Sequence, residues 1–199
     1  VHLPVQSGST PVLKRMQRGY TREQYIEKID DIRLAQHHIA LSTDVIVGFP
    51  GESTKQFEET LSLLEYVQYD SVFSFKYSPR SGTAAIEYED AVPEEEKSRR
   101  LAILQTMQRR IQQQNNERHV GMEEEVLVEG RREKRQQWIG RTSQNRILNF
   151  TTPARSDDTT GLLGSYCRVR VTAAGANSLV GEMVALTVQP ALNPLRILQ

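Results

Sequence analysis

The polar side chains that border two apolar stretches are the residues of this sequence best placed to do chemistry. The first stretch runs into "VQSGS", which contains Gln6 and Ser7. The second, "DVIVGFPGES", begins at Asp44 and ends in a turn with two glycines. A carboxylate in an apolar strand must be paired or face a cavity, because burying an unpaired charge is costly. A single polar strand end is usually only a helix cap, and two such strand ends in series weaken that interpretation.

The turn formed by Gly48 and Gly51 matches neither common phosphate-binding loop. The glycines are too close together for G-x-x-x-x-G-K-[ST], no lysine follows the second one, and G-x-G-x-x-G is absent. In βα folds the loops after the strands carry ligand sites, and glycine lets backbone approach a ligand closely. The residues alone leave open whether this turn is only structural. They also leave open whether Arg15 and Arg18 are solvated surface charges or a guanidinium clamp for a carboxylate.

Cysteine and histidine usage indicates that the chain alone holds no metal site. Cys167 is the only cysteine, so neither a disulfide nor a Cys-ligated cluster can be built from this chain by itself. The four histidines show no metal-ligand spacing with each other or with carboxylates. No apolar run approaches the roughly 18 residues of a membrane span, and nothing resembles a signal peptide. We therefore expect a soluble, cytoplasmic protein without a membrane partner, and the apolar start at Val1 suggests a fragment.

Residues 1–119 alternate short apolar strands with amphipathic helices, a pattern typical of βα units with parallel strands. We expect Thr21 and a serine at position 53 to cap two of the helices. Strands are predicted over residues 2–6, 40–49 and 70–78, and helices over 9–16, 21–36, 53–67 and 93–121.

From residue 120 the pattern changes to short β-strands separated by Gly, Asp, Asn and Thr turns. About five strands in some seventy residues predict a small antiparallel barrel or sandwich. We place the domain boundary near residues 115–122 and a tail at residues 191–199.

The formal net charge is zero, yet residues 130–170 carry an excess of basic side chains, which makes this stretch a candidate anion-binding surface. Trp138, Phe150 and Tyr166 lie among them, the mixture of aromatic and cationic residues with which proteins bind single-stranded RNA. Phe150 could equally belong to the core, whereas Trp138 and the arginines are expected on the surface. The basic residues are Arg131, Arg132, Lys134, Arg135, Arg141, Arg146, Arg155, Arg168 and Arg170.

Four successive segments resemble consecutive motifs of the radical S-adenosylmethionine methylthiotransferases: "HLPVQSGSTPVLKRMQRGYT", "STDVIVGFPGES", "FSFKYSPRSGTAA" and "VPEEEKSRRLAILQ". The resemblance implies an α/β fold, the C-terminal part of a radical SAM (β/α) partial TIM barrel over residues 1–119. Residues 120–190 resemble the family's small antiparallel β-barrel, the RNA-binding TRAM domain. Nearly the whole chain is covered.

The segment "GRTSQNRILNF" is similar to the tRNA-modifying branch of the family and not to the branch that modifies a ribosomal protein. The implied reaction is methylthiolation of C2 of prenylated adenosine next to the anticodon by a radical mechanism. The implied partners are the tRNA anticodon stem-loop, a sulfur donor and an electron donor such as flavodoxin. Two alternatives remain, namely a methylthiotransferase for threonylcarbamoyl-adenosine tRNA and a non-catalytic RNA-binding module.

The resemblance also implies roles for individual residues. Gln6 and Ser7 would line the S-adenosylmethionine site, Arg18 would meet the methionine carboxylate, and Asp44 would hold the ribose hydroxyls. Gly48 would shape the loop around the adenosine. The implied RNA-binding residues are Arg131, Arg135, Trp138, Arg141, Asn145 and Arg146.

The sequence departs from the family in the ligands of the iron-sulfur clusters. Family members carry C-x-x-x-C-x-x-C for the cluster that cleaves S-adenosylmethionine, and three further cysteines for a second cluster. The full-length enzyme is thus expected to hold two 4Fe-4S clusters, whose ligands are absent from this chain. We assign no catalytic or metal-binding residue and expect the chain alone to be inactive.

Overall fold

The computed structural model describes residues 1–36, 39–88, 91–152 and 161–188. The chain divides into two compact units, Val1–Asn115 and Asn116–Gln199. Among the described residues, no helix has the length and apolarity required to cross a membrane. The predicted tail at residues 191–199 and the basic residue Arg155 lie outside the described residues.

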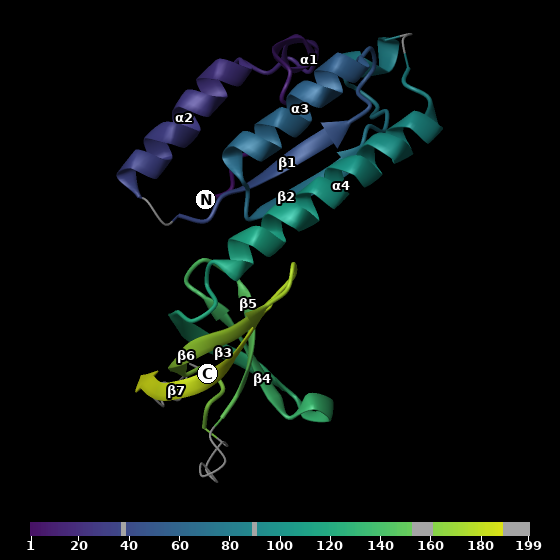
Figure 1. Cartoon of the computed structure of the whole chain (residues 1–199). Helices are drawn as coiled ribbons and strands as arrows, with labels where there is room; N and C mark the ends of the chain where they lie inside the picture. The colour runs from purple at the N-terminus through teal and green to yellow at the C-terminus, as the bar shows by residue number, and fades with distance from the viewer. Residues whose placement is uncertain (37–38, 89–90, 153–160, 189–199) are drawn as a thin grey trace, which may run out of the picture. The chain divides into compact units, whose positions relative to one another are not determined.

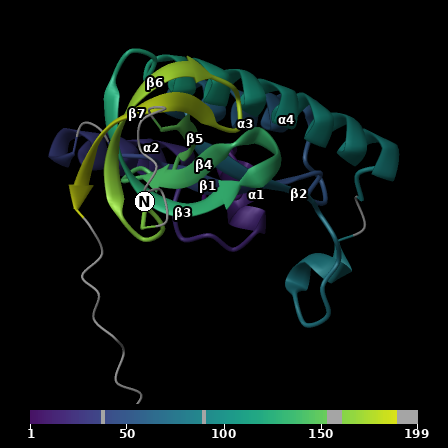
Figure 2. The same ribbon diagram turned by 90° about the horizontal axis from the view of Figure 1, so that it is seen from below.

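The first unit places helices against one face of a small parallel sheet (Figures 1 and 2). The two strands pair in parallel from Ser42↔Ser71 to Val47↔Lys76. Val45 and Val47 join side chains of α2, α3 and α4 in one core cluster. The elements are α1 (Thr10–Arg15), α2 (Arg22–Ala35), β1 (Ser42–Val47), α3 (Thr54–Val67), β2 (Ser71–Lys76), η1 (Ala84–Glu87) and α4 (Glu94–Glu117).

The predicted helix caps are confirmed by the hydrogen bonds at the helix starts. Thr21 caps α2 and Ser53 caps α3, and each forms a reciprocal capping box with the glutamine three residues later. Such caps depend on residues close in sequence, which explains why the pattern reveals them.

The segment predicted as a strand over residues 2–6 does not form one. It runs beside β1 but makes only isolated parallel bridges, His2↔Ser42 and Gln6↔Val45. Pro4 has no backbone N–H to donate, and Gln6 adopts a left-handed backbone with φ 70°. These two residues interrupt regular pairing while leaving the segment attached to the sheet.

Near the start of α4, Glu96 interacts with two arginines, and this cluster predicts that the protein loses stability in acid. Glu96 accepts hydrogen bonds from Arg99 Nε (2.7 Å) and from Arg100 Nε (2.8 Å), and these lower the pKa of its carboxyl to about 2. Because the folded-state pKa is lowered, its contribution is complete above the ordinary value of 4.5 and disappears as the pH falls toward 2. We expect Glu96→Gln to flatten the pH dependence of stability in this window, measured by urea denaturation.

The neighbouring change Glu95→Gln is the matched control, because Glu95 is exposed and makes no ion pair with a described residue. In Glu95→Gln, the free energy of unfolding should change with pH as it does in the wild type over the same window. An equal flattening by both variants would contradict the role given to the Glu96 cluster.

The second unit is a closed barrel of five strands in the order β3-β4-β5-β7-β6. All neighbouring pairs are antiparallel except β5 and β7, which are parallel. The expectation of a fully antiparallel barrel is therefore wrong at one seam. A closed ring with an odd number of strands cannot alternate direction throughout, so one parallel pair is unavoidable. The elements are β3 (Glu123–Arg132), η2 (Glu133–Arg135), β4 (Gln137–Thr142), β5 (Ile147–Thr151), β6 (Tyr166–Ala174) and β7 (Leu179–Val188).

Candidate functional site

A pocket of about 750 Å³ lies in the first unit, beside the two strands and the loops that border them. Three of the five residues predicted to bind the cofactor line it, namely Gln6, Arg18 and Asp44. Ile46 and Phe75 contribute apolar surface from β1 and β2. The pocket therefore combines charged and apolar walls, as small-molecule sites commonly do.

Gln6 lines the pocket and has a strained backbone conformation. Its N–H donates to the Asp44 carbonyl (2.8 Å), and its own carbonyl accepts from the N–H of Ile46 (2.9 Å). The left-handed conformation costs a non-glycine residue about 1–2 kcal/mol, so the surrounding contacts must hold it in place. Backbone strain of this kind concentrates at ligand sites.

Asp44 has both a possible ion-pair partner and a cavity beside it, as expected for a carboxylate in an apolar strand. Burial alternates along β1, with Thr43 and Val45 in the core and Asp44 on the opposite face, where its side chain is 31% exposed. Its Oδ1 lies 3.5 Å from His2 Nε2, and the residue lines the pocket. The carboxylate is thus half-buried, has a cationic partner within reach when His2 is protonated, and borders a cavity.

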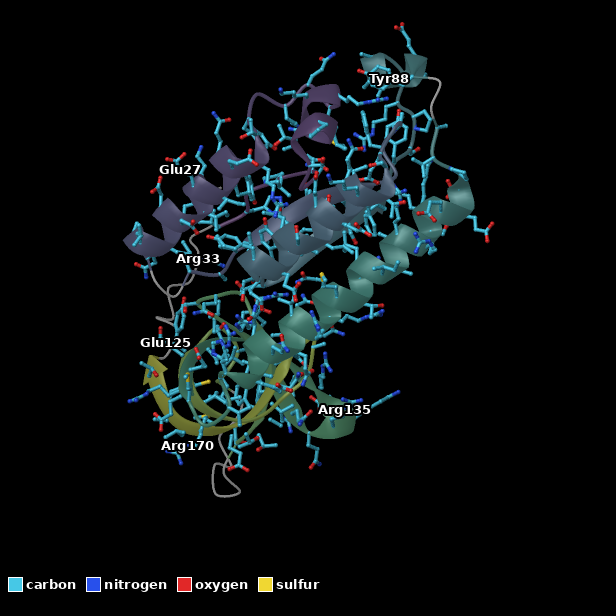
Figure 3. All side chains as sticks on the ribbon, turned by 45° about the horizontal axis from the view of Figure 1, so that its top comes forward. Glu27, Arg33, Tyr88, Glu125, Arg135 and Arg170 are labelled. Carbon is cyan, nitrogen blue, oxygen red and sulfur yellow. The ribbon has the colours of Figure 1, made fainter. Side chains whose placement is uncertain are left out.

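The two arginines considered as a carboxylate clamp have different surroundings. The Arg15 guanidinium stacks 5.1 Å from the centre of the Tyr88 ring, and the Tyr88 hydroxyl donates to the Arg15 carbonyl (3.2 Å). Figure 3 shows Tyr88 at the end of the first unit, on the segment that follows β2. Arg18 also lines the pocket, is exposed, and makes no ion pair with a described residue. Of the two arginines, Arg18 is therefore the one whose guanidinium has fewer partners among the described residues.

Ser7 and Gly48 are not among the residues that line the pocket. Ser7 is fully buried, and its hydroxyl accepts a hydrogen bond from the Ser9 N–H (3.2 Å). Gly48 has φ 69°, and a Cβ there would lie 2.4 Å from Cγ of Lys97. The structure thus shows both residues supporting the loops, while their contact with a cofactor stays a prediction.

A buried ion pair fixes the glycine turn, and sequence reasoning missed it. Glu52 and Arg100 are 3% and 4% exposed, and Arg100 Nη1 donates to Glu52 Oε2 (2.8 Å). The same carboxylate oxygen accepts from the Gly48 N–H (2.7 Å). Burial raises the pKa of Glu52, and these two donors oppose the shift. No local spacing links residues 48 positions apart, so only the fold reveals the pair.

In the barrel, three predicted RNA-binding residues hold the turn between β4 and β5. Arg141 pairs with Glu129 (Nε to Oε2, 3.1 Å) and donates to the Asn145 side chain (3.0 Å). Arg146 donates to the side chain of Asn116. These side chains therefore already have partners within the unit, and binding an RNA phosphate would require them to share or exchange those partners.

The expectation that Trp138 lies on the surface is wrong. Its side chain belongs to the barrel core, and the residue is only 8% exposed. On β4 it lies opposite Phe150 of β5, which is fully buried. The Arg131 guanidinium lies 5.4 Å from the ring centre. Alternation along β4 directs Trp138 inward, which the mixed composition of the stretch conceals.

The available positive charge is concentrated at the hairpin between β3 and β4. Arg132, Lys134 and Arg135 make no ion pair with any described residue, and Arg135 is labelled there in Figure 3. By contrast, Arg170 and Arg168 both pair with Glu123, and the Arg170 hydrogen bond lowers the pKa of that carboxyl. The hairpin is thus the stronger candidate for binding anions.

Comparison with protein families agrees with this division. Residues 1–64 match the Radical SAM superfamily, and residues 117–184 match the TRAM domain. After these similarities, the first unit is called the Radical SAM segment and the second unit the TRAM domain.

Several proteins similar to the chain carry the name tRNA-2-methylthio-N(6)-dimethylallyladenosine synthase. The chain is 57% identical to the protein of Koribacter versatilis over 92% of its length and 56% identical to that of Solibacter usitatus over 94%. It is 45% identical to the protein of Geobacter sulfurreducens over 92% of its length. It covers 41%, 41% and 40% of these proteins, respectively, and so spans about two fifths of the relatives it matches.

The Radical SAM segment fits S-adenosylmethionine by the chemistry of its pocket. The superfamily uses this cofactor together with iron-sulfur chemistry. A half-buried carboxylate, Asp44, can accept hydrogen bonds from ribose hydroxyls, and a guanidinium, Arg18, can bind a carboxylate. The buried, strained Gln6 adds an amide beside them.

The same chain does not fit an iron-sulfur cluster. Its only cysteine, Cys167, is buried in the core of the TRAM domain, where burial raises the pKa of the thiol to about 11. The described residues contain no group of histidine, cysteine and acidic side chains that could hold a metal ion. The described residues therefore offer no set of ligands for such a cluster.

Proposed function

We propose that this chain is part of a tRNA methylthiotransferase that acts at C2 of a prenylated adenosine next to the anticodon. The observation that carries the proposal is the joint occurrence of a Radical SAM segment and a TRAM domain, aligned over more than nine tenths of the chain with synthases of that name. In this proposal residues 1–119 are the C-terminal part of a partial (β/α) barrel, and residues 120–190 are the TRAM domain.

The Radical SAM segment is proposed to bind and orient the cofactor. Asp44 would hold the ribose, Arg18 the methionine carboxylate, and Gln6 the adjoining wall, while Ser7 and Gly48 keep the two loops in place. S-adenosylmethionine, when bound, supplies the radical and methyl-transfer chemistry, and the protein supplies placement. The ligands of the iron-sulfur clusters, two in the proposed full-length enzyme, would come from residues outside this chain.

The TRAM domain is proposed to bind the anticodon stem-loop through the hairpin between β3 and β4. Arg131 and Arg135 would contact phosphates at this hairpin, while Arg141, Asn145 and Arg146 would present the turn between β4 and β5, at the other end of β4. A sulfur donor, an electron donor such as flavodoxin, and a cytoplasmic location complete the proposal.

Deletion of the gene that encodes this chain tests the function. Mass spectrometry of nucleosides from total tRNA should show the methylthio group lost and the prenylated adenosine retained. Return of the intact gene should restore the group, whereas the gene carrying Asp44→Ala should not. Unchanged methylthio-prenyladenosine after deletion would contradict the proposal, and loss of a methylthio group from threonylcarbamoyl-adenosine would select the sibling activity.

Cofactor binding by the pocket gives a second prediction. Asp44→Ala should weaken binding of S-adenosylhomocysteine roughly 10- to 100-fold, because a hydrogen bond to a charged group contributes about 1.5–3 kcal/mol. Isothermal titration calorimetry measures the loss. Asp31→Ala is the matched control, since Asp31 is an exposed residue of α2 and does not line the pocket. Equal affinities for wild type and Asp44→Ala would remove Asp44 from the site.

A further inference from the structure

The pocket of the Radical SAM segment carries an excess of positive charge that S-adenosylmethionine does not neutralise. Among the described residues that line it, the cations outnumber the single carboxylate of Asp44. S-adenosylmethionine itself has a net charge of +1, since its sulfonium and ammonium groups exceed its one carboxylate. The cofactor therefore adds to the positive charge of the pocket. The lining cations are Arg15, Arg18, Lys76 and Arg80.

Three of these cations already have a partner or a proposed task. Lys76 pairs with Glu94, and Arg15 stacks on Tyr88. Arg18 is assigned to the cofactor carboxylate under the proposed function. These three cations are therefore not the first candidates for binding an anionic ligand other than the cofactor.

Arg80 is the remaining cation, and among the described residues only its main chain has hydrogen-bond partners. Its carbonyl accepts hydrogen bonds from the Thr83 hydroxyl (2.8 Å) and from the Thr83 N–H (3.3 Å). The residue is exposed, and its guanidinium makes no ion pair or hydrogen bond with any described residue. A cation held at a pocket wall by its main chain alone is suited to bind an anion that arrives from solution.

Phe75 indicates what kind of anion that is. It lines the same pocket from β2 and is 55% exposed, although phenylalanine is usually buried. An exposed aromatic ring and a guanidinium that line one pocket are the pair of groups with which proteins stack a base and neutralise its phosphate. Together they favour a nucleotide over an isolated inorganic anion.

We propose that Arg80 binds a backbone phosphate of the target nucleotide in RNA as its base enters the pocket against Phe75. This inference rests on the proposed function and adds a second RNA contact, in the Radical SAM segment, to that of the TRAM domain. An enzyme that modifies a base must take it out of its stack, which brings the adjoining phosphates to the mouth of the pocket.

The test compares the salt dependence of RNA binding for the wild-type chain and Arg80→Gln. The probe is a fluorescein-labelled anticodon stem-loop RNA, and anisotropy is recorded over a series of KCl concentrations. Loss of one phosphate contact should reduce the slope of log K against log salt by about 0.7, the value for a single strand. Arg109→Gln is the matched control, because Arg109 is an exposed arginine of α4 outside the pocket. Its slope should equal that of the wild type.

The possible results separate this inference from the function on which it rests. A wild-type chain that fails to bind the RNA would overturn the RNA-binding proposal and the Arg80 assignment together. Wild-type binding with an unchanged slope in Arg80→Gln would overturn the assignment alone. Titration with S-adenosylhomocysteine should give the same affinity for both proteins, and a weaker affinity in Arg80→Gln would assign Arg80 to the cofactor carboxylate instead.

Discussion

Glu52→Gln is expected to lower the free energy of unfolding of the Radical SAM segment by about 3 kcal/mol, the lower end of the range for breaking a buried ion pair. The change keeps an acceptor for the Gly48 N–H but removes the charge that faces Arg100. That guanidinium is 4% exposed and keeps its ion pair with Glu96, but it loses the buried carboxylate that faces its Nη1. Breaking a buried pair in this way is more costly than losing an exposed pair. Urea denaturation at neutral pH, followed by circular dichroism, measures the loss.

The paired change Glu52→Leu with Arg100→Met shows whether the charge is the cause. Removing both partners should recover much of the loss, because apolar residues of similar size often replace a buried ion pair at little cost. Hydrogen exchange should place the weakened amides around the glycine turn and α4. A single-variant loss below about 1 kcal/mol, the range of exposed pairs, would show that solvent reaches the pair.

Trp138→Ala should destabilise the TRAM domain by about 3–5 kcal/mol, the usual cost of truncating a buried aromatic residue to alanine. The side chain packs in the barrel core opposite Phe150, so its loss leaves a cavity. Because Trp138 is the only tryptophan, the wild-type fluorescence reports on this domain, and the variant must be followed by circular dichroism.

The comparison with Tyr166→Ala decides between a core role and a stacking role. Tyr166 is an aromatic residue of the same barrel and is 42% exposed, so its truncation should change stability little. If Trp138→Ala instead leaves the unfolding midpoint unchanged and weakens RNA binding, the tryptophan stacks on RNA and its burial is not maintained in solution.

Features that depend on neighbouring residues could be predicted from the sequence. The caps at Thr21 and Ser53 follow from side chains three residues apart, and the change from helices to short strands marks the second unit. Asp44 stands out in the sequence because a carboxylate in an apolar strand needs a partner or a cavity. The structure supplies both.

Features set by distant contacts could not be predicted. The Glu52–Arg100 pair joins two segments with no common motif, and the inward direction of Trp138 depends on its register with β5. The segment at residues 2–6 has the composition of a strand, but the backbone of Gln6 departs from that geometry. The parallel seam between β5 and β7 follows from closing five strands into a ring, which no single stretch encodes.

The burial of Cys167 makes this protein convenient for site-specific labelling. A thiol reacts as the thiolate, and a raised pKa together with burial keeps the native cysteine almost wholly protonated and inaccessible at neutral pH. Within these 199 residues, a cysteine introduced at an exposed position would then be the one thiol that maleimide reagents modify. Placed at position 80, it could carry a photoreactive group that cross-links to RNA and identifies the nucleotide beside the pocket.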